Sequence, residues 1–217
     1  MPKKHSKIIL DLEFNPVRVP EIREKMRHEI IEIGAVKLDD SLKEIAAFDE
    51  YIKPAYNTVE EKISHLTGIT NEQLEPCGDF DTVMHRFMGW IGDEPYSLYS
   101  WSLTDMNVML DEIDYKFPED ECYDMFFVHW TDLQKIYQRQ MGFYKSMGLT
   151  NALGSLNIYF DGTEHGALAD ARNTAEIMRY LSDSEKMDKF RNRTHVTYNT
   201  SSDSSGFSLG NITIKRK

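Results

Sequence analysis

The 217-residue sequence has only two cysteines and no long apolar run. Cys77 and Cys122 stand apart, in neither a CxxC pair nor a disulfide framework, which is the pattern expected in the reducing cytoplasm. No apolar segment approaches the roughly 18 residues that a membrane-spanning helix needs, so we expect no membrane association through such a helix. The basic start of the chain is followed by a short apolar segment that is acidic at its end. We therefore expect a strand there and not a signal peptide.

Basic residues are also scarce, with 25 Lys and Arg against 36 Asp and Glu and a formal net charge of −11. The charge is uneven, because residues 191–217 contain five basic residues and one acid, which leaves about −15 for residues 1–190. Such a negative charge argues against extended binding to duplex DNA, which requires many Lys and Arg contacts to phosphates. It still allows a nucleic-acid enzyme that holds only a strand end, with metal ions supplying the positive charge.

Composition divides the chain into two parts. The apolar share of 41% and the aromatic share of 12% are typical of a globular protein, and the length allows one sizeable core. Towards the C-terminus the sequence becomes rich in Ser, Thr, Asn and Gly. We therefore predict a folded domain over residues 1–190 and a flexible, basic tail over residues 191–217. Two roles stay open for the tail, an electrostatic tether for nucleic acid and a solvated terminus.

The expected elements begin with strands and continue with strands and helices in alternation. Strand-like segments at 8–14, 29–38 and 45–52 predict an antiparallel meander at the start of a mixed sheet, and 96–101 predicts a further buried strand. Helical spacing or helix signals are found at 21–28 (short), from Asn71 after a turn segment at 63–70, at 79–91, from a Ser102 or Thr104 cap to 116, at 131–141, at 151–156 and from 166 to 181. An acidic loop is expected at 118–124. This order predicts a three-layer α/β domain.

The first strand carries two acids near its end. In a strand the side-chain period is two, so Asp11 and Glu13 leave one face while their apolar neighbours leave the other. Two crowded carboxylates repel one another, and a divalent cation with oxygen ligands relieves that repulsion. The plainer alternative is an edge strand whose two acids face solvent.

Three further polar residues stand at element boundaries. Asp105 follows the expected strand 96–101, where an acid at a helix start can simply complement the helix dipole. Asp170 lies between alanines in the last long helix, where burying an unpaired charge would cost several kcal/mol. His165 precedes that helix in a loop, and a lone loop histidine by itself indicates little.

Together these residues form an ordered pattern: D-x-E on a first strand, an Asp at a strand-to-helix junction, and then H-x-A-x-x-D ending at Asp170. With this pattern the sequence resembles the DEDDh (DnaQ-like) 3′–5′ exonuclease family, which has an RNase H-like fold with a central mixed sheet flanked by helices. The resemblance extends over residues 7–181. It includes the segments EIGAV at 32–36, HLTGI at 65–69 and DARNTA at 170–175.

The resemblance implies a role for each residue of the pattern. Four carboxylates would hold two Mg²⁺ or Mn²⁺ ions, and one imidazole would act as general base: Asp11, Glu13, Asp105 and Asp170, with His165. Such a pair of ions activates water and stabilises the leaving 3′-oxygen, and imidazole suits a base because it titrates near neutral pH. For substrate binding the resemblance points to Leu12, Phe14, His65, Leu66 and Asn173. Core packing, or an ordinary exposed helical Asn, is the alternative for several of these.

Within the family, segments 101–105 and 157–162 most resemble the branch of histone-mRNA and small-RNA trimming exonucleases and their bacterial relatives. The expected function is therefore a metal-dependent 3′–5′ exonuclease acting on a single-stranded 3′ end, with RNA favoured over DNA. A DNA-directed proofreading or repair exonuclease and a non-cutting RNase H-like adaptor protein stay as alternatives. Two departures from the family are Gly166, where a larger residue is frequent, and the elaborated stretch 16–28.

Overall fold

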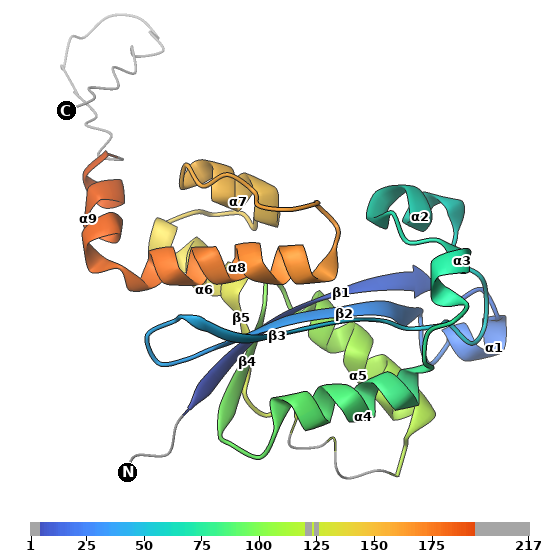
Figure 1. The fold of residues 1–217 in the computed structure, drawn as a ribbon. Coiled ribbons are helices and arrows are strands. Elements are labelled where there is room, and N and C mark those ends of the chain that lie inside the picture. Colours follow the sequence, from blue (N-terminus) through green and yellow to red (C-terminus); the bar gives the residue numbers. More distant parts are fainter. Residues whose placement is uncertain (1–4, 120–122, 124–125, 194–217) are drawn as a thin grey trace, which may run out of the picture.

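A five-stranded mixed sheet runs through the middle of the molecule, with helices on both of its faces (Figure 1). The computed structural model describes residues 5–119, 123 and 126–193. The strands are β1 (Ser6–Pro16), β2 (His28–Leu38), β3 (Glu44–Tyr51), β4 (Tyr96–Ser100) and β5 (Trp130–Asp132), in the spatial order β3-β2-β1-β4-β5. The first three pair antiparallel, whereas β4 pairs parallel with β1 and β5 parallel with β4. The predicted meander and mixed sheet are confirmed.

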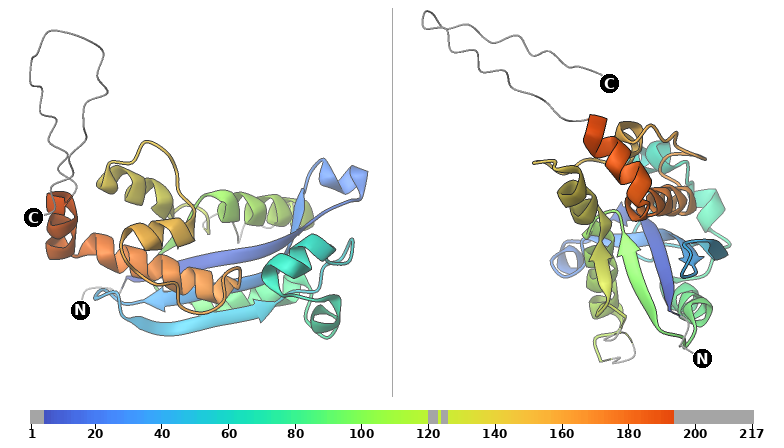
Figure 2. Two further views of the ribbon diagram at one scale, coloured as in Figure 1. Left: turned by 90° about the horizontal axis from the view of Figure 1, so that it is seen from above. Right: turned by 90° about the vertical axis from the view of Figure 1, so that its left-hand side faces the viewer.

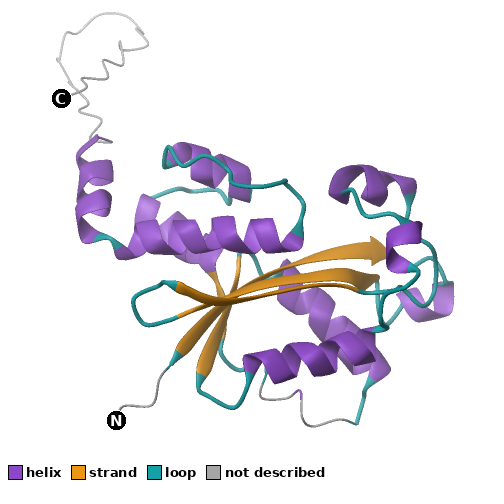
Figure 3. Ribbon diagram, in the orientation of Figure 1, coloured by secondary structure: helices purple, strands orange, loops and turns teal. Residues whose placement is uncertain are grey.

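Most of the helices form two layers, one on each face of the sheet. The helices are α1 (Pro20–Arg23), α2 (Glu61–Thr67), α3 (Asn71–Leu74), α4 (Phe80–Ile91), α5 (Thr104–Lys116), α6 (Leu133–Met141), α7 (Leu149–Ser155), α8 (Ala167–Ser182) and α9 (Ser184–Arg193). Helices α4 and α5 cover one face of the sheet, and α8 with α6 and α7 lies over the other (Figures 1 and 2). The strands thus form the middle of three layers (Figure 3). None of the described helices combines the length and the apolar character that crossing a membrane requires.

The alternating side chains of β1 supply both halves of the core. Ile8, Leu10 and Leu12 belong to the cluster under α4 and α5, whereas Ile9 belongs to the cluster under α8. This alternation follows from the two-residue period of a strand. It leaves Asp11 and Glu13 on the face that α8 covers.

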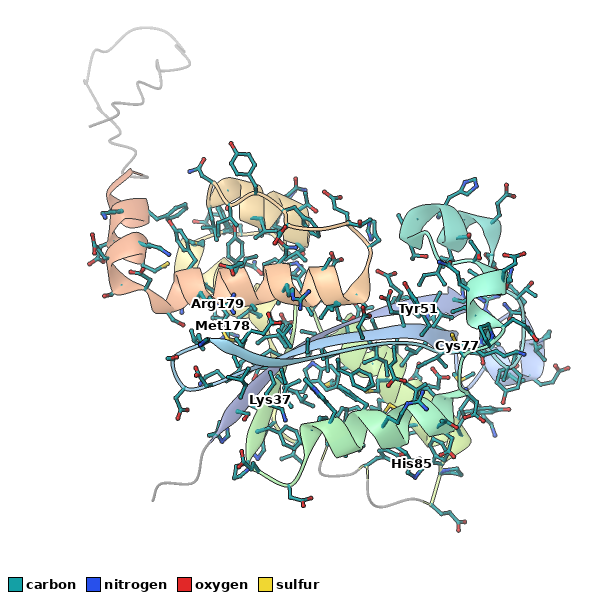
Figure 4. All side chains as sticks on the ribbon, in the orientation of Figure 1. Lys37, Tyr51, Cys77, His85, Met178 and Arg179 are labelled. Carbon is teal, nitrogen blue, oxygen red and sulfur yellow. The ribbon has the colours of Figure 1, made fainter. Side chains whose placement is uncertain are left out.

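Helix α8 lies close against the sheet. Ala171, Ala175 and Met178 form an apolar stripe that belongs to the buried cluster beneath the helix (Figure 4 labels Met178). In the last turn of α8, the Nε atom of Arg179 donates a hydrogen bond of 2.8 Å to the carbonyl oxygen of Leu42 in the β2–β3 turn. At the start of α8, a Cβ atom added to Gly34 on β2 would lie 2.0 Å from the backbone nitrogen of Leu168. The glycine therefore permits this close approach.

The prediction of a turn over the whole segment 63–70 is wrong. Its first half belongs to α2, and Gly68 ends that helix in the left-handed conformation (φ +77°) with its N–H bonded to the carbonyl of Ser64. Glycine is the usual residue for such a C-terminal cap. A second helix, α3, then starts after Thr70, whose side chain forms a capping box with Gln73. The expected helix start at Asn71 is confirmed.

Two further boundaries differ from expectation. Thr131 and Asp132 pair with β4 as part of β5, so α6 begins two residues later than predicted, after Asp132 accepts a hydrogen bond from the N–H of Lys135. The N-cap of α5 is Leu103 and neither Ser102 nor Thr104, although the Ser102 hydroxyl still accepts the N–H of Thr104. The predicted acidic loop 118–124 lies partly outside the described residues, and the predicted tail lies outside them except for the end of α9.

Candidate active site

The middle of β1 is where the acidic residues from distant segments meet. The parallel pairing of β1 with β4 ends at Ile9, and α5 begins beside the strand just beyond that point. There the Oδ1 atom of Asp105 accepts a hydrogen bond of 3.3 Å from the backbone N–H of Leu12. Asp105 is 7% exposed. A residue 93 positions away is thus fixed against the strand, which goes beyond the dipole role that was the plainer alternative for it.

Three side chains of the predicted set form one potential metal-binding group. Glu13, His165 and Asp170 each offer one ligand atom, and these atoms all lie within 4.8 Å of one another. The Oδ1 atom of Asp170 is buried and has no hydrogen-bond partner among the described residues. A buried carboxylate oxygen normally finds a partner, and a divalent cation is a suitable one. The residues present therefore fit a metal ion.

Burial and mutual repulsion raise the pKa of every carboxyl group in this cluster. Burial, together with the charges of Asp105 and Asp170, raises the pKa of Asp11 well above its usual value. Burial raises the pKa of Glu13 to about 9, that of Asp105 to about 7 and that of Asp170 to about 6, although His165 opposes the last rise. Such groups can all ionise near neutral pH only when positive charge lies among them. The electrostatics thus favour a cation-binding site.

His165 projects from a tight loop at the entrance to α8. Its backbone has φ +63°, in the left-handed region that only some non-glycine residues adopt. Gly162 in the same loop has φ +95°, and the N–H of Gly166 bonds to the carbonyl of Thr163 at 3.3 Å. The histidine side chain itself is exposed. Backbone strain of this kind is often found where a structure holds a functional side chain in place.

Asn173 fixes this loop to α8 from the inside. It is 1% exposed, which contradicts the alternative of an ordinary exposed helical Asn. Its Nδ2 atom donates hydrogen bonds of 2.8 Å to the carbonyl oxygens of Asp161 and Ala169, and its Oδ1 atom accepts the N–H of Asp161 at 3.1 Å. These bonds suit a role in which Asn173 orients the loop beside the site. Direct contact of Asn173 with substrate stays a prediction.

The other predicted substrate residues surround the end of β1. Leu12 is buried, and the ring of Phe14 lies edge-on to the ring of His28, with 5.0 Å between centroids. His65 and Leu66 lie on α2, which contacts β1, and Leu66 keeps 47% of its surface exposed. The exposed apolar surface of Leu66 suits a base-stacking contact. The roles of all four residues stay predictions.

Glu32 also belongs to the site, although it was not among the predicted residues. This residue pairs with Glu13 across β1 and β2, is 4% exposed, and accepts the N–H of Ala167 at 3.2 Å. Burial raises its pKa to about 8, and a hydrogen bond with Asp49 adds to the rise. The available signal was an acid inside the apolar run of the second strand. Glu32 ties the start of α8 to the sheet directly beside the metal-binding group.

Comparison with known proteins places this arrangement in a family. The family model RNase_T, described as exonuclease, matches residues 8–178. The chain belongs to this exonuclease family. It is 32% identical over 171 residues to human 3′-5′ exoribonuclease 1, a match that covers 72% of this chain and 47% of that protein. The chain therefore aligns with about half of the length of that relative.

Solved structures of this exonuclease family support the same assignment. The nuclease domain of 3′hExo, a DEDDh family member bound to rAMP, superposes with a TM-score of 0.66 at 26% identity, over 82% of this chain and 92% of that one. A 3′-exonuclease that recognises the 3′ end of the histone mRNA stem-loop superposes with a TM-score of 0.67 at 26% identity, over 82% and 64% of the two chains. The predicted DEDDh relationship, the RNase H-like fold and the likeness to the histone-mRNA branch are confirmed.

Proposed function

We propose that the protein is a metal-dependent 3′–5′ exonuclease that releases nucleoside 5′-monophosphates from the 3′ end of single-stranded RNA. The observation that carries this proposal is the group of Glu13, His165 and Asp170, whose ligand atoms lie within 4.8 Å of one another beside Asp11 and Asp105. The preference for RNA is supported by the names of the relatives, which are exoribonucleases, and by the rAMP bound to one structural neighbour.

The donor set indicates hard divalent cations, and we propose two Mg²⁺ or Mn²⁺ ions. Asp11, Glu13, Asp105 and Asp170 would hold them, because ionised carboxylates are the oxygen ligands that such ions prefer. When bound, the ions lower the pKa of a water molecule and screen the charge on the attacking and leaving oxygens. Four carboxylates gathered around one strand have no comparable use in an adaptor protein, so we favour the enzyme over a non-cutting adaptor.

The residues of the chain then have separate tasks. His165 accepts a proton from the water that attacks the phosphorus of the last phosphodiester bond. Its exposed position in the loop allows it to reach that water. The bond between phosphorus and the 3′-oxygen breaks, which yields a nucleoside 5′-monophosphate and a strand shortened by one nucleotide. Phe14 and Leu66 stack on the last bases, a contact that tolerates any base. Asn173 and Glu32 hold the loop and the helix start that position His165 and Asp170.

The test is hydrolysis of 5′-labelled single-stranded RNA by an Asp170→Asn variant, with Asp40→Asn as the control. Asp40 is exposed in the β2–β3 turn, so the same chemical change there should have no effect. We expect Asp170→Asn to reduce kcat by at least about 1,000-fold, because losing a metal ligand removes several kcal/mol of transition-state stabilisation. Without metal its unfolding temperature should equal or exceed that of wild type, because a repelled buried charge is gone.

Two further arms test the reaction class and the substrate. EDTA should abolish hydrolysis, and added Mg²⁺ or Mn²⁺ should restore it. Matched RNA and DNA strands compared side by side report the substrate preference, and higher kcat/KM for DNA would contradict the RNA assignment. Wild-type activity in Asp170→Asn, or full activity in EDTA, would contradict the proposed site.

A further inference from the structure

The stretch between β1 and β2, residues 16–28, is basic in an otherwise acidic molecule; we call it the α1 segment. It contains four basic residues and two acids, whereas residues 1–190 together carry about −15. Arg18 is the one of the four that forms a side-chain ion pair, with Glu60 before α2. Arg23, Lys25 and Arg27 are exposed, and they have no ion-pair partner among the residues that the structure describes.

Three arginines on α4 and α8, in contrast, form ion pairs. Arg86 pairs with Glu50, Arg172 with Glu44 and Arg179 with Glu176. Acids are abundant enough to neutralise these cations locally. The charges of Arg23 and Arg27 thus remain available for an anionic partner from outside the chain.

The α1 segment is held in a fixed position at the end of β1. Val17 and Met26 are fully buried, and the N–H of Val17 bonds to the carbonyl of Arg27 at 2.9 Å. The side chain of Asn57 accepts the N–H of Arg18 and donates to the carbonyl of Pro16. Figure 1 shows α1 beyond the end of β1, at the opposite end of the molecule from α9. A pre-ordered segment binds a partner without the entropy cost of ordering itself.

The α1 segment continues directly from the acid cluster. Phe14 follows Glu13 in the chain, and its ring contacts that of His28. The charges of Arg27 and Arg23 lie close enough to His28 to lower its pKa, although burial contributes more and Asp111 opposes the shift. The aromatic pair and the two arginines are therefore neighbours, and Phe14 is the next residue after Glu13 in the chain.

We propose that the α1 segment binds the part of the substrate strand that lies 5′ of the terminal nucleotides, with Arg23 and Arg27 contacting its phosphates and His28, whose ring adjoins that of Phe14, extending the stacking surface. This inference rests on the proposed exonuclease function. Backbone phosphates attract cationic side chains whatever the sequence, and aromatic rings stack on any base. The strand leaving the active site otherwise faces an acidic body that repels it.

The test compares substrates of two lengths in a double variant, Arg23→Ala with Arg27→Ala. For a single-stranded RNA of about 12 nucleotides, we expect KM to rise about 5- to 30-fold with kcat unchanged. The slope of log(kcat/KM) against log[salt] is negative, and it should become shallower by about 1.4, since each phosphate contact on a single strand contributes about −0.7. A trinucleotide has only one phosphodiester beyond the scissile one, so its KM should change much less. A DNA strand of equal length should respond as the RNA does, because the contacts are to phosphates.

The control is Arg139→Ala, another exposed arginine without an ion-pair partner among the described residues; it lies on α6, which packs against α8 and β4. It should change neither KM nor the salt slope. An Arg23→Lys and Arg27→Lys variant should keep most of the salt slope, because the charges remain. An unchanged KM on the long strand, or an equal rise on the trinucleotide, would overturn the inference. Failure of wild type to hydrolyse either substrate would instead overturn the proposed function.

Discussion

Gly34 is the position where adding one methyl group should damage the active site most. It lies opposite Asp11 in the β1–β2 ladder and beneath the first turn of α8. An added Cβ atom would lie 2.0 Å from the nitrogen and 2.5 Å from the Cα of Leu168, and 2.2 Å from the carbonyl carbon of Ala167. All of these are backbone atoms, which cannot rotate away as a side chain can. In a Gly34→Ala variant the helix start must move.

The size of the movement follows from these distances. Ordinary contact begins near 3.4 Å, so the start of α8 must shift by about 1.4 Å from the added atom. That shift stretches the bond of 3.2 Å between Glu32 and the N–H of Ala167, and it carries Asp170 away from Glu13. Overpacking of this kind costs about 1–3 kcal/mol of folding free energy. A displacement of about 1 Å at a catalytic group can cost about 100-fold in rate.

The assay pairs RNA hydrolysis with thermal unfolding. We expect Gly34→Ala to lower kcat about 100-fold or more and to lower the unfolding temperature. Gly89→Ala in α4 is the matched control, because an added Cβ there meets nothing within 4 Å. Its helix should gain up to about 1 kcal/mol from the better propensity of alanine, with unchanged activity. A Gly34→Ala protein with wild-type kcat and unfolding temperature would refute the reasoning.

Two further predictions concern buried acids. In EDTA, the unfolding free energy should fall as the pH rises from about 5 to about 9. The reason is that folding raises the pKa of Glu13 to about 9 and that of Asp170 to about 6, so the folded state holds protons that the unfolded state has lost. The loss approaches about 1.4 kcal/mol per pH unit for each such proton. Urea titrations across this range, with and without Mn²⁺, check it, and a metal-free slope of zero would contradict it. Glu112→Ala should destabilise by about 3–5 kcal/mol in chemical denaturation, because it leaves the N–H of Ile30 and the charge of Lys116 without their closest acceptor. Glu112→Gln keeps an acceptor and should lose less, so equal losses in the two variants would contradict this account.

The parts of the site that the sequence predicted are those with a strong local signal. Asp11 and Glu13 stand in an apolar run whose two-residue period decides their shared face. Asp170 is embedded among alanines that must pack closely, and that context marked it as unusual. Helix α4 was likewise predicted, because residues 79–91 show a clear helical period; in the structure Asp79 is its N-cap and Gly92 its C-cap.

The parts that escaped prediction depend on partners far away in the chain. Glu32 and Glu112 look like ordinary strand and helix acids, yet each is buried because a distant backbone N–H, from Ala167 or Ile30, needs an acceptor there. The short strand β5 exists because β4 offers it an edge to pair with, which no local propensity reveals. Tertiary context, and not weak propensity, decided each of these cases.

A site of this kind links folding to metal binding. Burying several like charges around β1 lowers the stability of the metal-free fold, and a tightly packed contact such as that of Gly34 with α8 offsets part of the loss. A cation that binds only the folded state adds about 2.7 kcal/mol at 100 times its Kd. The same carboxylates that hold the catalytic ions should therefore make those ions stabilise the protein, and a variant that removes one carboxylate should gain stability without metal and gain less from metal. Carboxylates that merely faced solvent would hardly give both effects in one variant, namely a higher stability without metal and a smaller gain in stability from metal.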